Sequence, residues 1–141
     1  MIKKMNIVVV GLGNIGSYFY NHLKKNKNIL FNKTNTVPNI LYVSARSLGK
    51  KRGIKIPKNK WLKNCISATK IKDVDIIVEL IGGAEGIAKK LVFEALKNKK
   101  HVITANKALV AKYGDQLAKI AEKNKVNFEF EAAVCGGIPI I

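Results

Sequence analysis

Short apolar runs alternate along the chain with longer stretches in which apolar residues recur every three or four positions. Residues 7–10, Ile-Val-Val-Val, form a continuous β-branched run between polar residues and a glycine. Such a run is typical of a strand that is buried on both faces of a parallel sheet. Similar runs predict further strands at residues 40–44, 75–81, 101–104 and 127–133.

Amphipathic stretches predict helices between these strands. One begins near residue 15, a second covers residues 84–98, and a third lies within residues 111–125. The apolar periodicity predicts these core positions: Ile15, Tyr18, Phe19 and Leu23; Ile87, Leu91, Val92, Ala95 and Leu96; Leu117, Ile120 and Ala121. Residues 26–39 are polar and residues 47–57 are basic, so we expect loops at both places.

The order of these elements predicts an α/β fold with a doubly wound parallel sheet. Alternating strands and helices pair the strands in parallel and place helical crossovers on both faces. We expect one domain over residues 1–141, with no membrane span and no signal peptide. The final residues, 135–141, are apolar, which we interpret as a chain that continues into a further domain absent from this sequence.

The formal net charge is +17, from 26 basic and 9 acidic residues, and a charge of this size raises the question of nucleic-acid binding. The lysines, however, are spread over almost every predicted helix and loop, and no aromatic residues alternate with them for stacking. We therefore expect a solvated basic surface, with no nucleic acid and no membrane as a partner.

The two cysteines, Cys65 and Cys135, are far apart in the sequence and have no CxxC spacing or neighbouring histidine pair. This pattern does not predict a metal site or a disulfide framework. We expect reduced thiols packed as small apolar groups in a cytoplasmic protein.

The residues after the first predicted strand fit the pattern GxGxxG: Gly11, Leu12, Gly13, Asn14, Ile15 and Gly16. With a strand before it and an amphipathic helix after it, this pattern predicts pyrophosphate binding in a Rossmann-type dinucleotide domain. We expect Gly11 to make the tight turn, Gly13 to let the pyrophosphate approach the backbone, and Gly16 to let the helix pack closely. A purely structural turn is the alternative.

The second predicted strand should end at the adenosine ribose, where an acidic residue usually marks a preference for NAD. No acid is present there. A hydroxyl and a cluster of cations follow instead, and these groups suit a phosphomonoester: Ser44, Arg46, Lys50, Lys51 and Arg52. We therefore predict NADP as the cofactor, with Arg46 at its 2′-phosphate. NAD is the alternative cofactor, and a solvated basic loop is the alternative reading of the cations.

Further candidates lie at the ends of the next two predicted strands, the edge at which doubly wound sheets bind ligands. We expect cofactor contacts from Gly82, Gly83, Thr104 and Lys107. Lys107 would project toward the nicotinamide, where an ammonium group stabilises the alkoxide-like oxygen that develops during carbonyl reduction. We interpret Glu79, inside an apolar strand, as a core carboxylate bonded to backbone N–H groups, with a role in the site as the alternative.

Five ordered blocks, GLGNIG, VSARSLGKKRG, VELIGG, VITANKALVAKYG and FEAAVCGGIPII, closely resemble homoserine dehydrogenase and extend over essentially the whole chain. The resemblance implies reversible NAD(P)H-dependent reduction of aspartate 4-semialdehyde to homoserine, on the route to threonine and methionine. It also implies a homodimer in the complete protein, and a further segment with substrate-binding acids and the principal proton-donating lysine. A nucleotide-sensing regulatory domain without catalysis is the alternative function.

The resemblance also assigns individual residues. Lys107, in the block TANK, matches a family lysine beside the nicotinamide and the substrate, so it is the candidate catalytic residue. Glu131, Val134, Gly136 and Ile138 match positions that bind a monovalent cation, commonly sodium, largely through backbone carbonyls. This cation site follows from the resemblance alone, because from the residues themselves we expect only a glycine-bearing turn after a strand.

Overall fold

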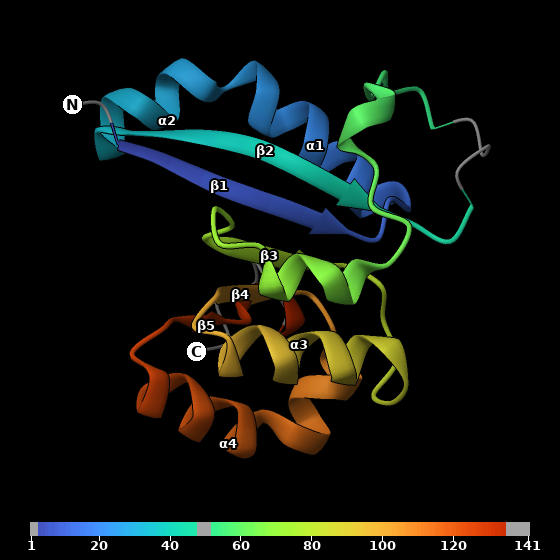
Figure 1. Ribbon diagram of the computed structural model, residues 1–141, viewed down its shortest axis with the longest axis vertical. Helices are drawn as coiled ribbons and strands as arrows, with labels where there is room; N and C mark the ends of the chain where they lie inside the picture. Colours follow the sequence, from blue (N-terminus) through green and yellow to red (C-terminus); the bar gives the residue numbers. More distant parts are fainter. Residues whose placement is uncertain (1–2, 48–51, 135–141) are drawn as a thin grey trace.

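The computed structural model describes residues 3–47 and 52–134, which form a parallel sheet with helices on both faces (Figure 1). The strands are β1 (Lys3–Val10), β2 (Thr36–Ser44), β3 (Ile76–Glu79), β4 (His101–Thr104) and β5 (Phe128–Glu129). Their order is β2-β1-β3-β4-β5, and every neighbouring pair is parallel. The predicted doubly wound α/β arrangement is therefore confirmed.

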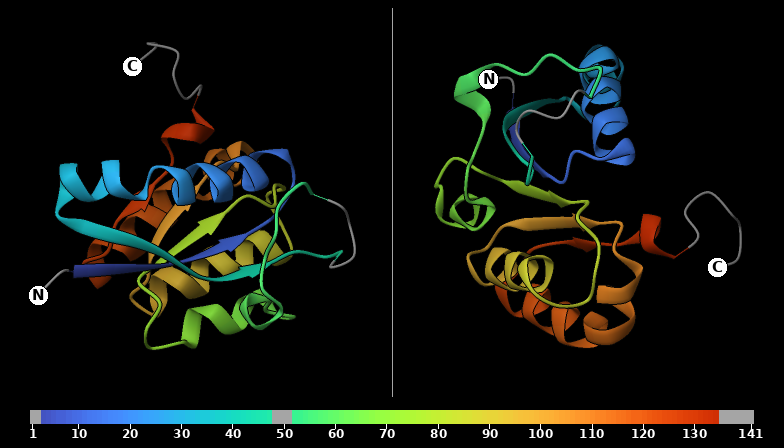
Figure 2. Two further views of the ribbon diagram at one scale, coloured as in Figure 1. Left: turned by 90° about the horizontal axis from the view of Figure 1, so that it is seen from above. Right: turned by 90° about the vertical axis from the view of Figure 1, so that its right-hand side faces the viewer.

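The helices are α1 (Asn14–Lys25), α2 (Lys27–Thr34), α3 (Ile87–Lys97) and α4 (Lys107–Asn124), with 3-10 turns η1 (Lys58–Lys60), η2 (Cys65–Lys70) and η3 (Glu131–Ala133). Figure 2 shows α1 and α2 on one face of the sheet, and η2 and α3 on the opposite face. Helix α4 packs against α3. In the described ranges, no helix has the length and apolar character needed to cross a membrane.

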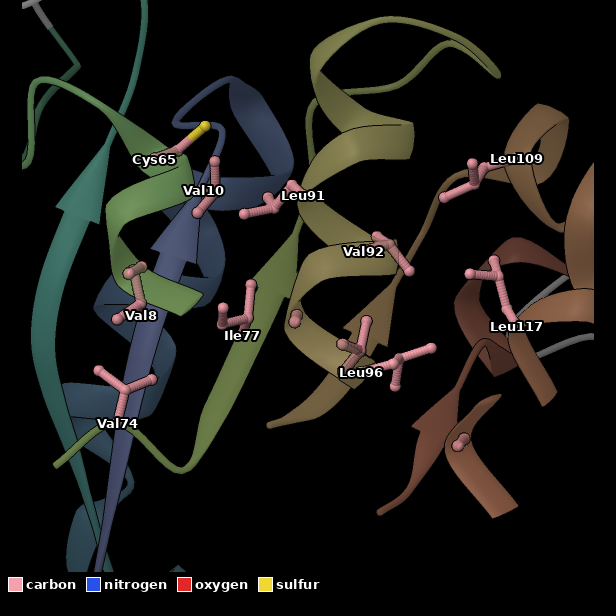
Figure 3. Close-up of a cluster of buried hydrophobic side chains, with 14 residues drawn as sticks. Val8, Val10, Cys65, Val74, Ile77, Leu91, Val92, Leu96, Leu109 and Leu117 are labelled. Atoms are coloured by element: carbon pink, nitrogen blue, oxygen red, sulfur yellow. The ribbon is translucent and has the colours of Figure 1, made fainter. Parts of the chain in front are cut away.

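Strand β1 lies between β2 and β3 and divides the apolar core into two clusters. Val8 and Val10 belong to the cluster with η2, α3 and α4, whereas Ile7 and Val9 belong to the cluster with α1. Successive side chains of a strand point to opposite faces, which explains this division. Figure 3 shows the first cluster, where side chains of β1 and β3 meet side chains of η2, α3 and α4. Fully burying one such Val or Leu stabilises the fold by about 1.5–3 kcal/mol.

The prediction of a loop over residues 26–39 is wrong. Lys27–Thr34 forms α2, and β2 already begins at Thr36. Helix α2 has no buried residue, so it has no apolar stripe that a sequence pattern could report. Pro38 is tolerated within β2 because β2 is an edge strand, where a missing N–H donor does not break a second ladder.

The inward faces of two helices also differ from the prediction. Ile15 and Tyr18 are 64% and 69% exposed, and α1 instead buries Gly16 and Tyr20. Helix α1 packs closely against the loop before it at Gly16, where the absence of a side chain permits the contact. The buried side of α1 therefore includes Gly16 rather than Ile15 and Tyr18. Ile87 is exposed as well, because it is the first residue of α3, while the other predicted core positions of α3 are buried.

The start of α4 and the extent of β5 also differ from the sequence pattern. Helix α4 starts at Lys107, before the predicted residue 111, because the side chain of Asn106 caps its first turn. The predicted strand at residues 127–133 is limited to Phe128–Glu129 and is followed by η3. The first shift brings the N-terminus of α4 close to the carboxyl end of β4, and the second replaces the end of the predicted strand with a turn.

Candidate functional site

The loop between β1 and α1 is held against the end of β3. Gly11 has a φ of 99°, a conformation that L side chains rarely adopt, and its amide donates to the Ser44 carbonyl at 2.9 Å. A Cβ on Gly11 would overlap the backbone carbonyl of Leu80. The turn and the close contact both require glycine at this position.

Gly16 and Gly13 have opposite surroundings. A Cβ on Gly16 would overlap the carbonyl oxygen of Gly11, so the absence of a side chain lets α1 pack directly onto the loop. No atom of the described residues lies within 4 Å of the position that a Cβ on Gly13 would take. The backbone at Gly13 therefore borders open space, where a ligand can approach it.

The first turn of α1 begins beside this open space. Within the described residues, no side chain caps its amides and no acidic residue lies in the turn. Asn14 and Ile15 are exposed, whereas Leu12 is buried. The first N–H groups of a helix have no partner within it and carry the positive end of the helix dipole. This turn is therefore suited to an anion such as a pyrophosphate.

A cavity of about 450 Å³ lies beside the loop. It is lined by the end of β1 and the glycine loop, by the residues after β2, by η2, and by the chain after β3: Val10, Gly11, Leu12, Gly13, Ser44, Ala45, Arg46, Ser47, Arg52, Lys63, Asn64, Cys65, Leu80, Ile81 and Ile87. These lining residues include three cationic side chains and no acidic one. The cavity lies at the carboxyl ends of parallel strands, where doubly wound domains bind ligands.

The chain after β2 carries the residues predicted to meet a ribose phosphate. Arg46 is exposed and lines the cavity. Ser44 is buried, and its hydroxyl donates to the Leu62 carbonyl at 2.9 Å. Lys50 and Lys51 lie outside the described residues. Among the predicted cations that the structure describes, Arg46 and Arg52 both line the cavity, and Arg46 is the one nearer in sequence to the end of β2.

Arg52 is bound to the glycine loop, a contact that no sequence spacing indicates. Its Nε–H donates to the Leu12 carbonyl at 3.0 Å, and its guanidinium also donates to the Ser47 carbonyl. The guanidinium carbon lies 5.7 Å from the centroid of the Trp61 ring, within the range of a cation–π contact. Arg52 thus connects the chain after β2 to the loop after β1, across one side of the cavity.

Glu79 and Thr104 lie opposite each other at the ends of β3 and β4. Both are fully buried, and the Thr104 hydroxyl donates to Glu79 Oε2 at 2.6 Å. Glu79 Oε1 accepts from the amide of Ile81 at 2.7 Å and from the amide of Gly82 at 3.1 Å. The interpretation of Glu79 as a core carboxylate bonded to backbone N–H groups is confirmed. Thr104 has no exposed surface, and its hydroxyl group binds Glu79 and the Asn106 amide.

Asn106 joins the loop after β3 to the start of α4. Its Oδ1 accepts from the Leu109 amide at 3.1 Å, and its Nδ2 donates to the Gly83 carbonyl at 2.7 Å. Its own amide donates to Thr104 Oγ1 at 3.1 Å. Sequence analysis did not single out Asn106, although an Asn immediately before a helical stretch is a common N-cap.

Lys107 is the first residue of α4 and is exposed. Within the part of the chain that the structure describes, its ammonium group has no hydrogen bond or ion pair. Val10, Glu79 and Thr104 are register partners across β1, β3 and β4, so the three following loops leave the sheet at one edge. The predicted residues of all three loops are therefore brought to the same edge, with the glycine loop and Arg46 lining the cavity itself.

Comparison with known proteins identifies the family. Residues 11–131 match the family profile described as "Homoserine dehydrogenase, NAD binding domain". The chain belongs to the homoserine dehydrogenase family. It is 41% identical to the homoserine dehydrogenase of Neisseria gonorrhoeae over 140 residues, which cover 99% of this chain and 32% of that protein. The homoserine dehydrogenase of Bacillus subtilis is 36% identical, with the same coverage of both chains.

Solved homoserine dehydrogenase structures share this fold. The enzyme from Thiobacillus denitrificans superposes with a TM-score of 0.87 at 36% identity, covering 98% of this chain and 32% of that one. The S. aureus enzyme at pH 7.5 gives 0.84 at 37% identity, covering 93% of this chain and 34% of that one. The chain thus spans about a third of the length of the relatives it matches, and it corresponds to their NAD-binding domain.

Two of the four positions predicted for a cation site, Glu131 and Val134, lie within the described residues. Glu131 begins η3 and is exposed, and its carbonyl accepts from the Val134 amide at 3.1 Å. Gly136 and Ile138 lie outside the described residues. A carbonyl oxygen has two lone pairs, so the Glu131 carbonyl retains one for a cation. Among the described residues, no group of three or more His, Cys, Asp or Glu side chains is placed to hold a metal ion.

Cys65 and Glu85 have shifted pKa values. Burial raises the pKa of the Cys65 thiol, which packs in the core and lines the cavity, and Cys65 is free as predicted. Cys135 lies outside the described residues. Glu85, in the loop after β3, has its pKa lowered to about 2, chiefly by the hydrogen bond from Lys112 at 2.6 Å and then by that from Tyr113. Glu85 thereby ties this loop to α4.

Proposed function

We propose that this chain is the cofactor-binding domain of an enzyme that reduces aspartate 4-semialdehyde to homoserine with NADPH. One observation supports the proposal most strongly. The space that a side chain on Gly13 would fill is open, and it lies in a cavity bordered by an uncapped helix N-terminus. Gly13 has a φ of −76°, which any residue adopts, so neither its backbone conformation nor its packing against the described residues requires glycine, whereas Gly11 and Gly16 are needed for packing.

A dinucleotide fits the residues around the cavity. The backbone of Gly13 and the exposed first turn of α1 would hold the pyrophosphate, since N–H groups and the helix dipole both favour negative charge there. Apolar surface from Leu80, Ile81 and Ile87 is available on the other side of the cavity for the adenosine half. The domain would thus bind the cofactor largely through backbone groups and shape.

We assign NADP rather than NAD on the charge of the cavity. Arg46, Arg52 and Lys63 are its charged lining residues, and no carboxylate among its lining residues is placed to accept hydrogen bonds from a ribose 2′-hydroxyl. Arg46 is exposed at the end of β2 and is our candidate for the 2′-phosphate. A guanidinium can donate two parallel hydrogen bonds to a phosphate, which makes it selective for the phosphorylated cofactor.

Lys107 supplies charge at the reacting carbonyl. When bound, the nicotinamide ring supplies the hydride for the aldehyde carbon. The exposed ammonium group of Lys107, at the carboxyl edge of the sheet, would orient the substrate and stabilise the negative charge that develops on the carbonyl oxygen. Because it makes no bond with any described residue, this ammonium group is available for that contact.

Three further features complete the proposal for the full-length enzyme. A monovalent cation, sodium in the simplest case, is held by backbone carbonyls that include those of Glu131 and Val134. The substrate-binding site is completed by a further domain, and the enzyme is a homodimer. A free and buried thiol at Cys65 supports a reducing compartment such as the cytoplasm.

An activity assay of the full-length protein tests this function. We expect reduction of aspartate 4-semialdehyde with a kcat/KM at least about tenfold higher for NADPH than for NADH, since one charged hydrogen bond contributes about 1.5–3 kcal/mol. Added sodium should raise the activity of sodium-free enzyme. Saturable binding of NADPH without any turnover of aspartate 4-semialdehyde would contradict the proposal and favour a nucleotide-sensing role.

A further inference from the structure

A fully buried carboxylate lies where two loops at the ligand-binding edge begin. Glu79 ends β3 and exposes no surface, although Glu is almost never fully buried without partners. Three donors satisfy it: the amides of Ile81 and Gly82 and the hydroxyl of Thr104. One carboxylate therefore binds both the loop after its own strand and the end of the neighbouring strand.

The hydrogen bonds continue from Thr104 into the next loop. Thr104 Oγ1 accepts from the Asn106 amide at 3.1 Å. The Asn106 side chain then binds the Gly83 carbonyl at 2.7 Å and the Leu109 amide at 3.1 Å. Gly83 belongs to the loop after β3, so the chain of bonds returns to the loop that Glu79 also holds.

Hydrogen bonds hold the turn at Gly82 and Gly83. Their φ values are 85° and 86°, and no atom of the described residues lies within 4 Å of either missing Cβ. Glycines in such an open turn have many alternative conformations. The hydrogen bonds with Glu79 and Asn106 restrict this freedom.

We propose that Glu79, Thr104 and Asn106 are positioning residues that lock the Gly82–Gly83 turn to the first turn of α4. Lys107 begins that helix, so the same bonds fix the backbone from which its side chain extends at the carboxyl edge of the sheet. The effect on Lys107 rests on the proposed function. The coupling of the two loops does not, because it is a property of the folded chain.

Hydrogen exchange in the full-length protein tests the coupling without relying on catalysis. Thr104→Val removes the shared hydroxyl with little change in volume, and we expect faster exchange in both residues 80–86 and residues 105–112. Thr69→Val is the matched control, because Thr69 is also fully buried and its hydroxyl donates to the Ile66 carbonyl at 2.9 Å, in η2. Faster exchange in one loop alone, or equal effects of the two variants, overturns the proposal.

Asn106→Asp keeps the proposal testable even where Thr104→Val does not fold. The variant retains an oxygen that caps α4, and it removes the N–H donor to the Gly83 carbonyl. We expect faster exchange in residues 80–86 while the far end of α4 remains protected. Unchanged exchange in residues 80–86 overturns the proposal.

Steady-state kinetics of the full-length enzyme tests the position of Lys107. We expect Thr104→Val to lower kcat about tenfold or more, because a misplacement of about 1 Å costs up to about 100-fold. Thr104→Ser, which retains the hydroxyl, should restore kcat, and Thr69→Val should leave it unchanged. A loss confined to KM, or no rescue by serine, overturns the positioning role. A wild-type enzyme that does not turn over aspartate 4-semialdehyde refutes the proposed function instead, and hydrogen exchange still decides the coupling.

Discussion

The carbonyl oxygen of Gly11 occupies the space into which a side chain on Gly16 would have to project. This contact joins the end of β1 to the first turn of α1 and leaves no room for a methyl group. Gly13, between them, has open space instead. Two glycines of the loop are therefore required by the fold, whereas neither the backbone conformation of Gly13, with a φ of −76°, nor its packing against the described residues requires a glycine.

Gly16→Ala should destabilise the domain. The new methyl group would overlap backbone rather than a flexible side chain, so the helix must shift away from the loop. Overpacking of this kind typically costs about 1–3 kcal/mol. Urea unfolding of the full-length protein, followed by a signal from this domain, measures the change. An unchanged midpoint would show that the loop has more room than the structure indicates.

Arg46→Ala should weaken NADPH binding about tenfold or more, through loss of a charged hydrogen bond, while NADH affinity changes little. Fluorescence titration with each cofactor measures both dissociation constants. Lys33→Ala, an exposed cation on α2 away from the cavity, is the control for the loss of one positive charge. Equal losses for the two cofactors would remove Arg46 from the 2′-phosphate site.

Lys107→Ala should lower kcat by about 100-fold or more, which is the usual loss in rate when a charge-stabilising group is removed. The midpoint of urea unfolding should change little, because the Lys107 side chain is exposed. Lys123→Ala, at the other end of α4, is the matched control. Parallel assays of turnover and urea unfolding separate the two effects. Near-normal turnover of the Lys107 variant would exclude this lysine from the mechanism.

Glu85 should remain ionised well below the range of an ordinary glutamate. Hydrogen bonds from Lys112 and then from Tyr113 lower its pKa from 4.5 to about 2. A depressed pKa means that the folded state gains stability from this carboxylate above pH 4.5 and loses that gain as the pH falls toward 2. Carboxyl-carbon NMR measures the pKa, and Tyr113→Phe should raise it. A titration midpoint near 4.5 would show that the contact is absent in solution.

Much of the fold was predictable because most of its elements have a buried side. The apolar runs around Val8, Ile77 and Val102 mark strands of the sheet, and these three side chains are fully buried in the structure. Helix α2 had no such signal, since it buries nothing. Ile15 and Tyr18 were misplaced because the helix packs through a glycine, which carries no hydrophobicity to detect.

The candidate site also contains features that the sequence could predict and features that it could not. The glycine loop was predictable from local spacing, because the turn and the close helix contact depend on residues within six positions of each other. The contacts of Arg52 with Leu12 and of Glu79 with Thr104 join residues that are distant in sequence. They depend on which strands are neighbours and on their register, and a single sequence pattern does not contain that information.

The most direct test of the central claim is a titration of NADPH into full-length wild-type protein and its Gly13→Val variant. The Cβ of the added valine would point into the open space beside the loop, with no atom of the described residues other than its chain neighbours within 4 Å. Gly114→Ala, on α4, is the control, since its new methyl group makes only an ordinary contact at 3.6 Å. We expect saturable binding to wild type and control, and none to a folded Gly13→Val. Equal affinity of all three proteins would contradict the assignment of this loop as the pyrophosphate site.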